Sequence, residues 1–195
     1  MTITPKKIKR MAVYGRFIQI LLLLLVFGSC NFGTPDYKLN VIIGEGVTGT
    51  PQAGEHTYKD LADVNFEYTG IDPRHTVEVF LNTIRQRSSG NFTMYTDVIL
   101  LTRLVDIRGS WKMVMQQTDP SETFEFDITL NGAGLTSGTF SDSRGYNGLW
   151  TAENGIITIS YTDWSGYVLN GSVFEMSGIF AVDGEDKGGW NAGRL

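Results

Sequence analysis

The sequence predicts an all-β protein in which a β-sandwich is followed by a small eight-stranded antiparallel meander or barrel. Two patterns support this prediction. Short runs in which apolar and polar residues alternate with a period of two occupy most of the chain after residue 38, and no segment has a convincing helical period. In the second half, turn signals recur about every 11 residues, a spacing typical of a sandwich or a barrel.

The N-terminus has the pattern of a secretory signal. The first 16 residues contain five Lys and Arg residues and no acid, and residues 17–27 are apolar apart from Gln19. The small residues Gly28 and Ser29 then precede Cys30, the only cysteine. A membrane-spanning helix needs about 20 apolar residues, so this shorter run favours a signal peptide over residues 1–29. A retained membrane anchor is the alternative.

The segment FGSC that ends at Cys30 resembles the lipobox of bacterial lipoproteins. This resemblance implies that Cys30 is lipidated and becomes the first residue of the mature chain, held to the membrane by its acyl chains. The residue after Cys30 is Asn31 rather than an acidic residue. By the same resemblance, this implies that the protein is located in the outer membrane of a double-membrane bacterium. Residues 30–37 would then be a lipidated tether. An incidental cysteine is the alternative.

The charge of the mature chain disfavours one class of partner. The first 16 residues carry five of the 16 Lys and Arg residues and none of the 21 Asp and Glu residues, so residues 30–195 have a net charge of about −10. A nucleic-acid-binding protein would need a basic surface stripe. The composition therefore predicts no nucleic-acid partner.

Residues 38–107 are predicted to form the first β domain. All four tryptophans lie beyond it, and this change in composition places the boundary near residue 108. We expect residues 44–54, which are rich in Gly and Thr, to form a turn region. The expected strands alternate apolar and polar residues over residues 39–43, 64–68, 77–81 and 92–94. Residues 98–105 form a nearly continuous apolar run with a polar break at residues 102–103, which is also expected to be a strand.

Four segments of this first domain, YKLNV, GVTGTP, GEHTY and VNFEY, resemble the divergent internalin-type B-repeat and related Ig-like modules of bacterial surface proteins. The similarity covers about 70 residues. It implies an Ig-like sandwich that acts as a spacer or an adhesive surface. It implies no catalytic residues.

Residues 108–195 are predicted to form the second domain, with eight strands that start at Trp111 and end near Trp190. Its clearest alternating runs are residues 124–130, 157–161 and 176–182. Closure of this meander would remove both sheet edges, which otherwise invite pairing with other chains.

The start and the end of this domain resemble the up-and-down barrels of the lipocalin and avidin superfamily. Gly109-Ser110-Trp111 matches the opening of the first strand in those barrels, and residues 135–140 resemble their third strand. The resemblance implies that Arg194, in the last strand, crosses the ring of Trp111 and closes the barrel. A cation–π contact of this kind contributes about 1 kcal/mol.

The tryptophans give the most specific candidate for a contact residue. We expect Trp111, Trp150 and Trp190 to fill the core, because a barrel of small residues needs bulk inside. Trp164 lies in the predicted turn of residues 163–166, where a large ring should be exposed. Exposed tryptophans often anchor binding partners, so Trp164 is the candidate ligand or partner contact.

No residue pattern predicts catalysis, a metal site or a cofactor. The two histidines, His56 and His75, lie on different predicted segments, and the acidic residues 183–186 are better explained as a hairpin turn than as a calcium loop. We therefore expect a non-enzymatic binding or structural role at the cell envelope, with an envelope protein or a glycan as partner. The alternatives are a carrier of small apolar ligands inside the barrel and an uncharacterised hydrolase.

Overall fold

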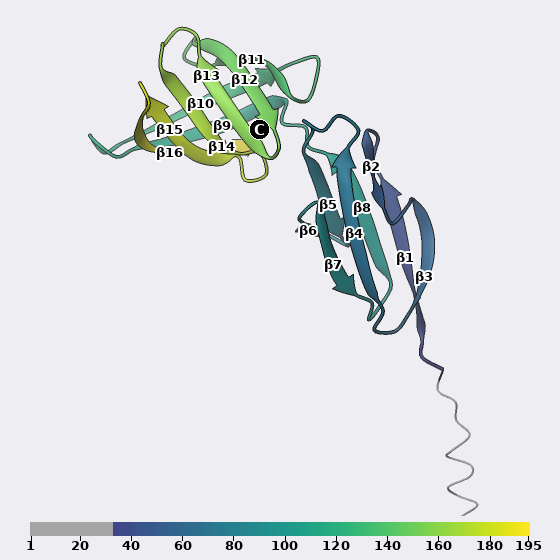
Figure 1. The fold of residues 1–195 in the computed structure, drawn as a ribbon. Helices are drawn as coiled ribbons and strands as arrows, with labels where there is room; N and C mark the ends of the chain where they lie inside the picture. The colour runs from purple at the N-terminus through teal and green to yellow at the C-terminus, as the bar shows by residue number, and fades with distance from the viewer. Residues whose placement is uncertain (1–32) are drawn as a thin grey trace, which may run out of the picture. The chain divides into compact units, whose positions relative to one another are not determined.

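The computed structural model describes residues 33–195, which form 16 β-strands and no helix, so the predicted all-β class is confirmed (Figure 1). Residues Asp36–Leu195 form one compact unit. This unit contains two separate hydrophobic cores. Leu104 packs against the first core and Val105 packs against the second, so the change from one core to the other falls between these two residues.

The first core lies between a five-stranded sheet and a three-stranded sheet, which together form the predicted sandwich. In spatial order the larger sheet contains β3 (Gly54–Lys59), β1 (Asp36–Ile43), β8 (Val98–Leu104), β5 (Val77–Leu81) and β6 (Ile84–Gln86). The smaller sheet contains β2 (Val47–Thr50), β4 (Asp63–Gly70) and β7 (Ser89–Thr93).

The strands of the sandwich follow the period-two pattern closely. In β4, Val64, Phe66 and Tyr68 are buried while the residues between them are exposed. Side chains alternate between the two faces of a strand, so this pattern places one face of β4 on the core. The first strand, β1, pairs in parallel with β8, with Leu39 opposite Val98.

The turn predicted over residues 44–54 is partly wrong, because β2 runs through it. Val47 is buried in the core, and β2 pairs with β4 so that Gly49 lies opposite Tyr68. A Cβ atom on Gly49 would overlap the carbonyl oxygen of Glu67 and the backbone of Tyr68. This glycine therefore permits close strand approach rather than a turn.

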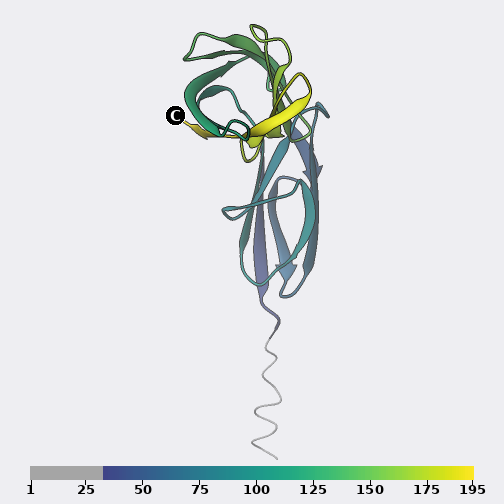
Figure 2. The same ribbon diagram turned by 90° about the vertical axis from the view of Figure 1, so that its left-hand side faces the viewer.

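The second core fills a closed antiparallel barrel of eight strands, as predicted. Each strand pairs with its neighbours in the chain, and β16 returns to pair with β9, which closes the ring seen in Figure 2. The strands are β9 (Gly109–Gln117), β10 (Glu122–Asn131), β11 (Ser137–Asp142), β12 (Asn147–Glu153), β13 (Ile156–Tyr161), β14 (Tyr167–Ser172), β15 (Ser177–Val182) and β16 (Glu185–Arg194).

Large apolar side chains occupy the interior of the barrel. The fully buried ones come from strands all around the ring and include Met113, Met115, Ile128, Leu130, Trp150, Ile157, Ile159 and Phe180. An eight-stranded barrel is just wide enough for its own side chains to fill it. This barrel therefore has a packed core.

Residues 1–32, which include the predicted signal peptide and Cys30, lie outside the described part of the chain. Among the described residues, no helix is long and apolar enough to span a membrane.

Candidate functional site

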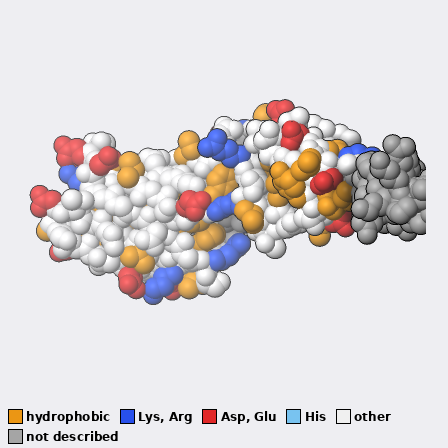
Figure 3. Space-filling view, turned by 90° about the horizontal axis from the view of Figure 1, so that it is seen from below, with side chains coloured by type: hydrophobic (Ala, Val, Ile, Leu, Met, Phe, Trp, Pro, Cys, Tyr) orange, Lys and Arg blue, Asp and Glu red, His pale blue; other side chains and the backbone are white. Residues whose placement is uncertain are grey.

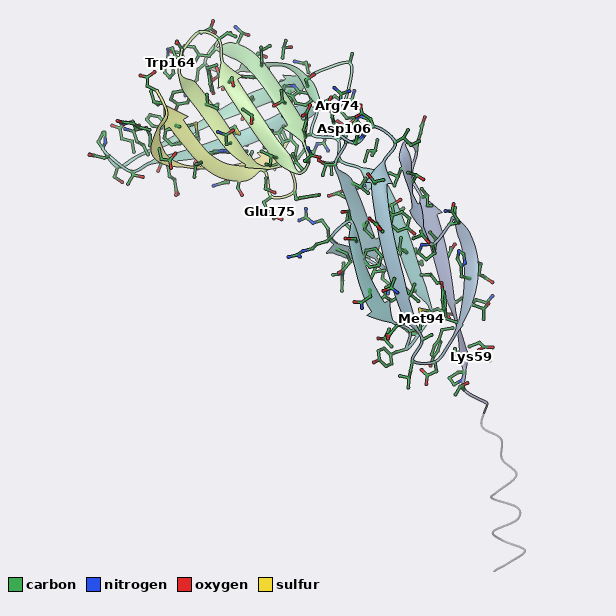
Figure 4. The ribbon with its side chains drawn as sticks, viewed as in Figure 1. Lys59, Arg74, Met94, Asp106, Trp164 and Glu175 are labelled. Atoms are coloured by element: carbon green, nitrogen blue, oxygen red, sulfur yellow. The ribbon has the colours of Figure 1, made fainter. Side chains whose placement is uncertain are left out.

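Trp164 lies at one rim of the barrel, in the loop of residues 162–166 between β13 and β14 (Figure 4). Its side chain is 42 % exposed, whereas Trp111, Trp150 and Trp190 are 9 %, 1 % and 3 % exposed. The predicted division into three core tryptophans and one exposed tryptophan is therefore confirmed.

Backbone hydrogen bonds hold this loop on both sides. On one side, the Asn147 N–H donates to Oδ2 of Asp163 across 2.7 Å, and the Thr162 N–H donates to the Asn147 carbonyl across 3.0 Å. On the other side, the Asp183 N–H donates to the Gly166 carbonyl across 3.0 Å. A loop that is already ordered loses little conformational entropy when it binds a partner.

Three tyrosines surround the indole of Trp164. The ring centroids of Tyr146, Tyr167 and Tyr161 lie 4.6, 5.5 and 6.4 Å from the centroid of Trp164. These distances are typical of favourable aromatic pairs. We call these four residues the aromatic platform.

The topology of the barrel explains why these rings meet. In an antiparallel meander every second turn lies at the same rim, so the β11–β12, β13–β14 and β15–β16 turns share one end of the barrel. Tyr146 directly precedes β12, Tyr161 ends β13 and Tyr167 begins β14. The platform is thus assembled from strand ends that flank neighbouring turns at this rim.

A partly buried polar cluster lies next to the platform. The Arg144 guanidinium donates from Nη2 to Oδ2 of Asp142 and to the Tyr161 hydroxyl across 2.7 and 3.1 Å. It also lies 3.6 Å from the ring centroid of Phe126, a cation–π contact. Burial raises the pKa of the Tyr161 hydroxyl above its ordinary value of 10.0.

A groove of about 440 Å³ opens beside Trp164. Its lining combines two aromatic rings, one aliphatic side chain and two polar side chains: Asp163, Trp164, Ser165, Tyr167 and Val182. Pockets for small ligands commonly have this volume and this mixture of apolar surface with a few polar groups.

The hydrogen bonding of the four indole N–H groups separates Trp164 from the others. Three indole N–H groups donate to backbone carbonyls across 2.8 to 3.2 Å. Trp111 donates to Ile107, Trp150 donates to Asn131, and Trp190 donates to both Asn170 and Ile179. Within residues 33–195 the indole N–H of Trp164 makes no hydrogen bond. The residue itself is 42 % exposed and lines the groove.

The structure also places the other predicted site residues. The guanidinium carbon of Arg194 lies 5.2 Å from the ring centroid of Trp111, where β16 pairs with β9. Asp183 and Gly184 form the tight turn between β15 and β16. Cys30 lies outside the described residues.

The two histidines have no role in the platform, since both belong to the sandwich half of the chain and are partly exposed. No group of three or more His, Cys, Asp or Glu side chains suited to a metal ion occurs in the described part of the chain.

Sequence reasoning missed the partners of Trp164. Nothing in the local sequence pattern indicates that Tyr146, Tyr161 and Tyr167 gather around Trp164 or that Arg144 lies beside them. The turn pattern could have indicated this cluster, because the three tyrosines and Arg144 lie in or next to two turns of the meander that share a rim. Comparisons with known proteins add no assignment, since no family model, no curated protein and no solved structure matches this chain significantly.

Proposed function

We propose that this protein is a lipid-anchored component of the cell envelope with a non-enzymatic binding role, and that the aromatic platform is its contact surface. One observation carries the proposal. Trp164 is 42 % exposed although it is fixed by a hydrogen-bonded loop and surrounded by tyrosines. A rigid, exposed tryptophan is the residue type that most often dominates the energy of a binding interface.

The proposed anchor rests on the N-terminal sequence. A basic segment, a short apolar run and two small residues precede the only cysteine, Cys30. Lipidation at that position would attach the chain to the membrane through residues 30–37, and we propose the outer membrane of a double-membrane bacterium as its location. The internalin-like and lipocalin-like resemblances remain part of this proposal.

The distribution of surface charge supports a partner other than nucleic acid. On the face drawn in Figure 3, several basic side chains gather near the middle of the view, with acidic and hydrophobic side chains beside them. Basic residues are also paired with acids, as in Lys112 with Glu125 at 3.3 Å and Lys38 with Glu55 at 3.0 Å. Pairing of this kind reduces the positive field that would attract phosphate.

The packed barrel weighs against the carrier alternative. A carrier needs free volume in the barrel, whereas Trp150 and Phe180 are each 1 % exposed inside it. A hydrolase would need free ionisable groups at its active site. At the platform, Arg144 and Asp142 are bound to each other. A binding surface requires neither a cavity nor a catalytic group.

The anchor is tested by the intact mass of the protein purified from its native membrane, compared with the Cys30→Ala variant. We expect a chain that starts at Cys30 with added acyl mass, and we expect the variant to lack that mass. A full-length, unmodified chain would contradict the anchor.

The contact surface is tested by sedimenting the purified full-length protein with envelopes from which lipid has been extracted. We expect the wild type to sediment and Trp164→Ala to remain in solution. The matched control is Leu149→Ala, which removes an exposed apolar side chain from the outer wall of the same barrel. Equal sedimentation of all three proteins, or none by the wild type, would contradict a binding role for the platform.

A further inference from the structure

We infer that the groove beside Trp164 binds a neutral saccharide, an inference that rests on the proposed binding function and specifies its ligand class. Three properties of the groove carry it: a partly exposed indole face, a set of free hydrogen-bonding groups, and the absence of an available cation among the residues that line it. The first property suits the face of a sugar ring, the second disfavours a purely apolar ligand, and the third disfavours an acidic one.

The aromatic surfaces suit the C–H face of a sugar ring. Trp164 and Tyr167 both line the groove, and their planes meet at 64°. Both rings therefore contribute aromatic surface to the groove, where the C–H groups of a pyranose could pack against them. The loop hydrogen bonds hold the indole in place, which lowers the entropic cost of stacking.

The polar groups around the indole suit hydroxyl groups, which both donate and accept hydrogen bonds. The Trp164 N–H has no hydrogen-bond partner among residues 33–195, and the Ser165 hydroxyl in the groove can donate or accept. Asp163 uses Oδ2 to accept from the Asn147 N–H. Its other oxygen accepts no hydrogen bond from residues 33–195 and is therefore available to a ligand hydroxyl. A purely apolar ligand would leave these groups unpaired, at a cost in affinity.

The local charge disfavours an acidic ligand. Asp163 lines the groove, and the carboxylate of Asp183 lies against Gly166 in the same loop. No Lys or Arg lines the groove, and the guanidinium of Arg144 is committed to Asp142 and Tyr161. An anionic sugar or a phosphate would meet carboxylates without a compensating cation. A neutral saccharide avoids this repulsion.

The test uses NMR on the full-length protein labelled with nitrogen-15, and it follows the four indole N–H signals. The signal of Trp164 is identified by its loss in Trp164→Phe. The probe is the envelope polysaccharide left after lipid extraction and exhaustive protease digestion, separated by anion exchange into a neutral and a charged fraction. Choline serves as an organic-cation probe, because an aromatic surface beside carboxylates could also attract a cation.

We expect the neutral fraction to shift the Trp164 signal while the other three indole signals stay in place. Trp164→Ala should weaken binding of that fraction at least tenfold, measured by calorimetry, and Leu149→Ala should leave it unchanged. Near-ultraviolet circular dichroism checks that both variants keep the packed barrel.

The remaining outcomes separate this inference from the proposed function. In one outcome, sedimentation with envelopes depends on Trp164, but the neutral fraction does not shift the Trp164 signal and only the charged fraction, choline or undigested envelope protein does. The inference of a neutral saccharide ligand is then overturned, and the binding role of the platform stands. If Trp164→Ala does not change sedimentation with envelopes, the binding role of the platform and the saccharide both fail.

Discussion

Nη2 of Arg144 lies 2.7 Å from Oδ2 of Asp142, whose side chain is fully buried, while the arginine side chain stays 30 % exposed. Asp142 also accepts from the backbone N–H groups of Arg144 and Tyr146 across 2.9 and 3.0 Å. The carboxylate therefore organises the β11–β12 turn, and the arginine neutralises it. This pair supports the rim on which the aromatic platform lies.

We predict that Arg144→Met destabilises the protein by about 3 kcal/mol, because it leaves a buried carboxylate without its cation. Urea unfolding at neutral pH measures the loss. Lys112→Met is the control, since it removes the cation of an exposed pair with Glu125 and should cost no more than about 0.5 kcal/mol. Equal losses in the two variants would show that the Asp142 pair does not support the barrel.

We predict that Arg194→Met costs about 1 kcal/mol, the free energy typical of a cation–π contact. The guanidinium of Arg194 faces the ring of Trp111 at 5.2 Å and donates to the Arg108 carbonyl. Arg194→Lys keeps the charge and should recover part of the loss in thermal unfolding. A fully stable Arg194→Met variant would mean that strand pairing alone closes the barrel.

We predict that Gly148→Ala destabilises the barrel by about 2 kcal/mol or more through overpacking. A Cβ atom on Gly148 would overlap the carbonyl oxygen of Ser160 and the ring of Phe140. Gly134→Ala is the matched control, because a Cβ atom there has nothing within 4 Å. Comparison of the urea midpoints checks the prediction, and similar midpoints for the two variants would contradict it.

We predict that the sandwich loses stability in alkali through Tyr68, whose hydroxyl donates to the Pro51 carbonyl across 2.7 Å. Burial, with a smaller contribution from Tyr58, raises the pKa of Tyr68 from 10.0 to about 12. A raised folded-state pKa contributes stability that is complete below pH 10 and is lost as the pH rises toward 12. The full loss is on the order of 2 kcal/mol.

The measurement compares urea unfolding at pH 8 and pH 11 for wild type and Tyr68→Phe. The variant should depend less on pH over this interval, although it loses a hydrogen bond at both values. Tyr95→Phe, at an exposed tyrosine, should keep the wild-type pH dependence. An unchanged pH dependence in Tyr68→Phe would assign the alkaline loss to other groups.

We predict that the wild-type barrel excludes small apolar probes and that Leu169→Ala admits them. Leu169 is fully buried in the barrel core, and its truncation should cost about 2 to 5 kcal/mol and leave a cavity. Xenon-induced shifts of methyl NMR signals report occupancy of that cavity. Xenon uptake by the wild-type barrel at the same pressure would instead revive the carrier alternative.

Much of the fold was predictable from local sequence patterns. In β10, Phe126, Ile128 and Leu130 are buried while Glu125 and Asp127 are exposed, which is the alternation that the sequence displays. The regular turns likewise indicated eight strands in the second half. Both signals are local, because successive side chains of a strand point to opposite faces whatever that strand pairs with.

Other features escaped sequence reasoning because they depend on pairing between distant segments. The short strand β2 lies in a segment rich in Gly and Thr, and it forms because β4 supplies its partner. The parallel pairing of β1 with β8 joins residues about 60 positions apart. No local pattern specifies which distant strand completes a sheet.

The sequence by itself determined the alternation of buried and exposed side chains and the exposure of Trp164, since a large ring in a short polar turn has no core to enter. Only the tertiary structure decided that Tyr146, Tyr161 and Tyr167 surround this ring and that Arg144 and Asp142 lie next to the same rim. The physical reason is the antiparallel order of the strands. Because β12 pairs with β13, the β11–β12 and β13–β14 turns lie side by side at one end of the barrel, and there the side chains of the two turns become neighbours.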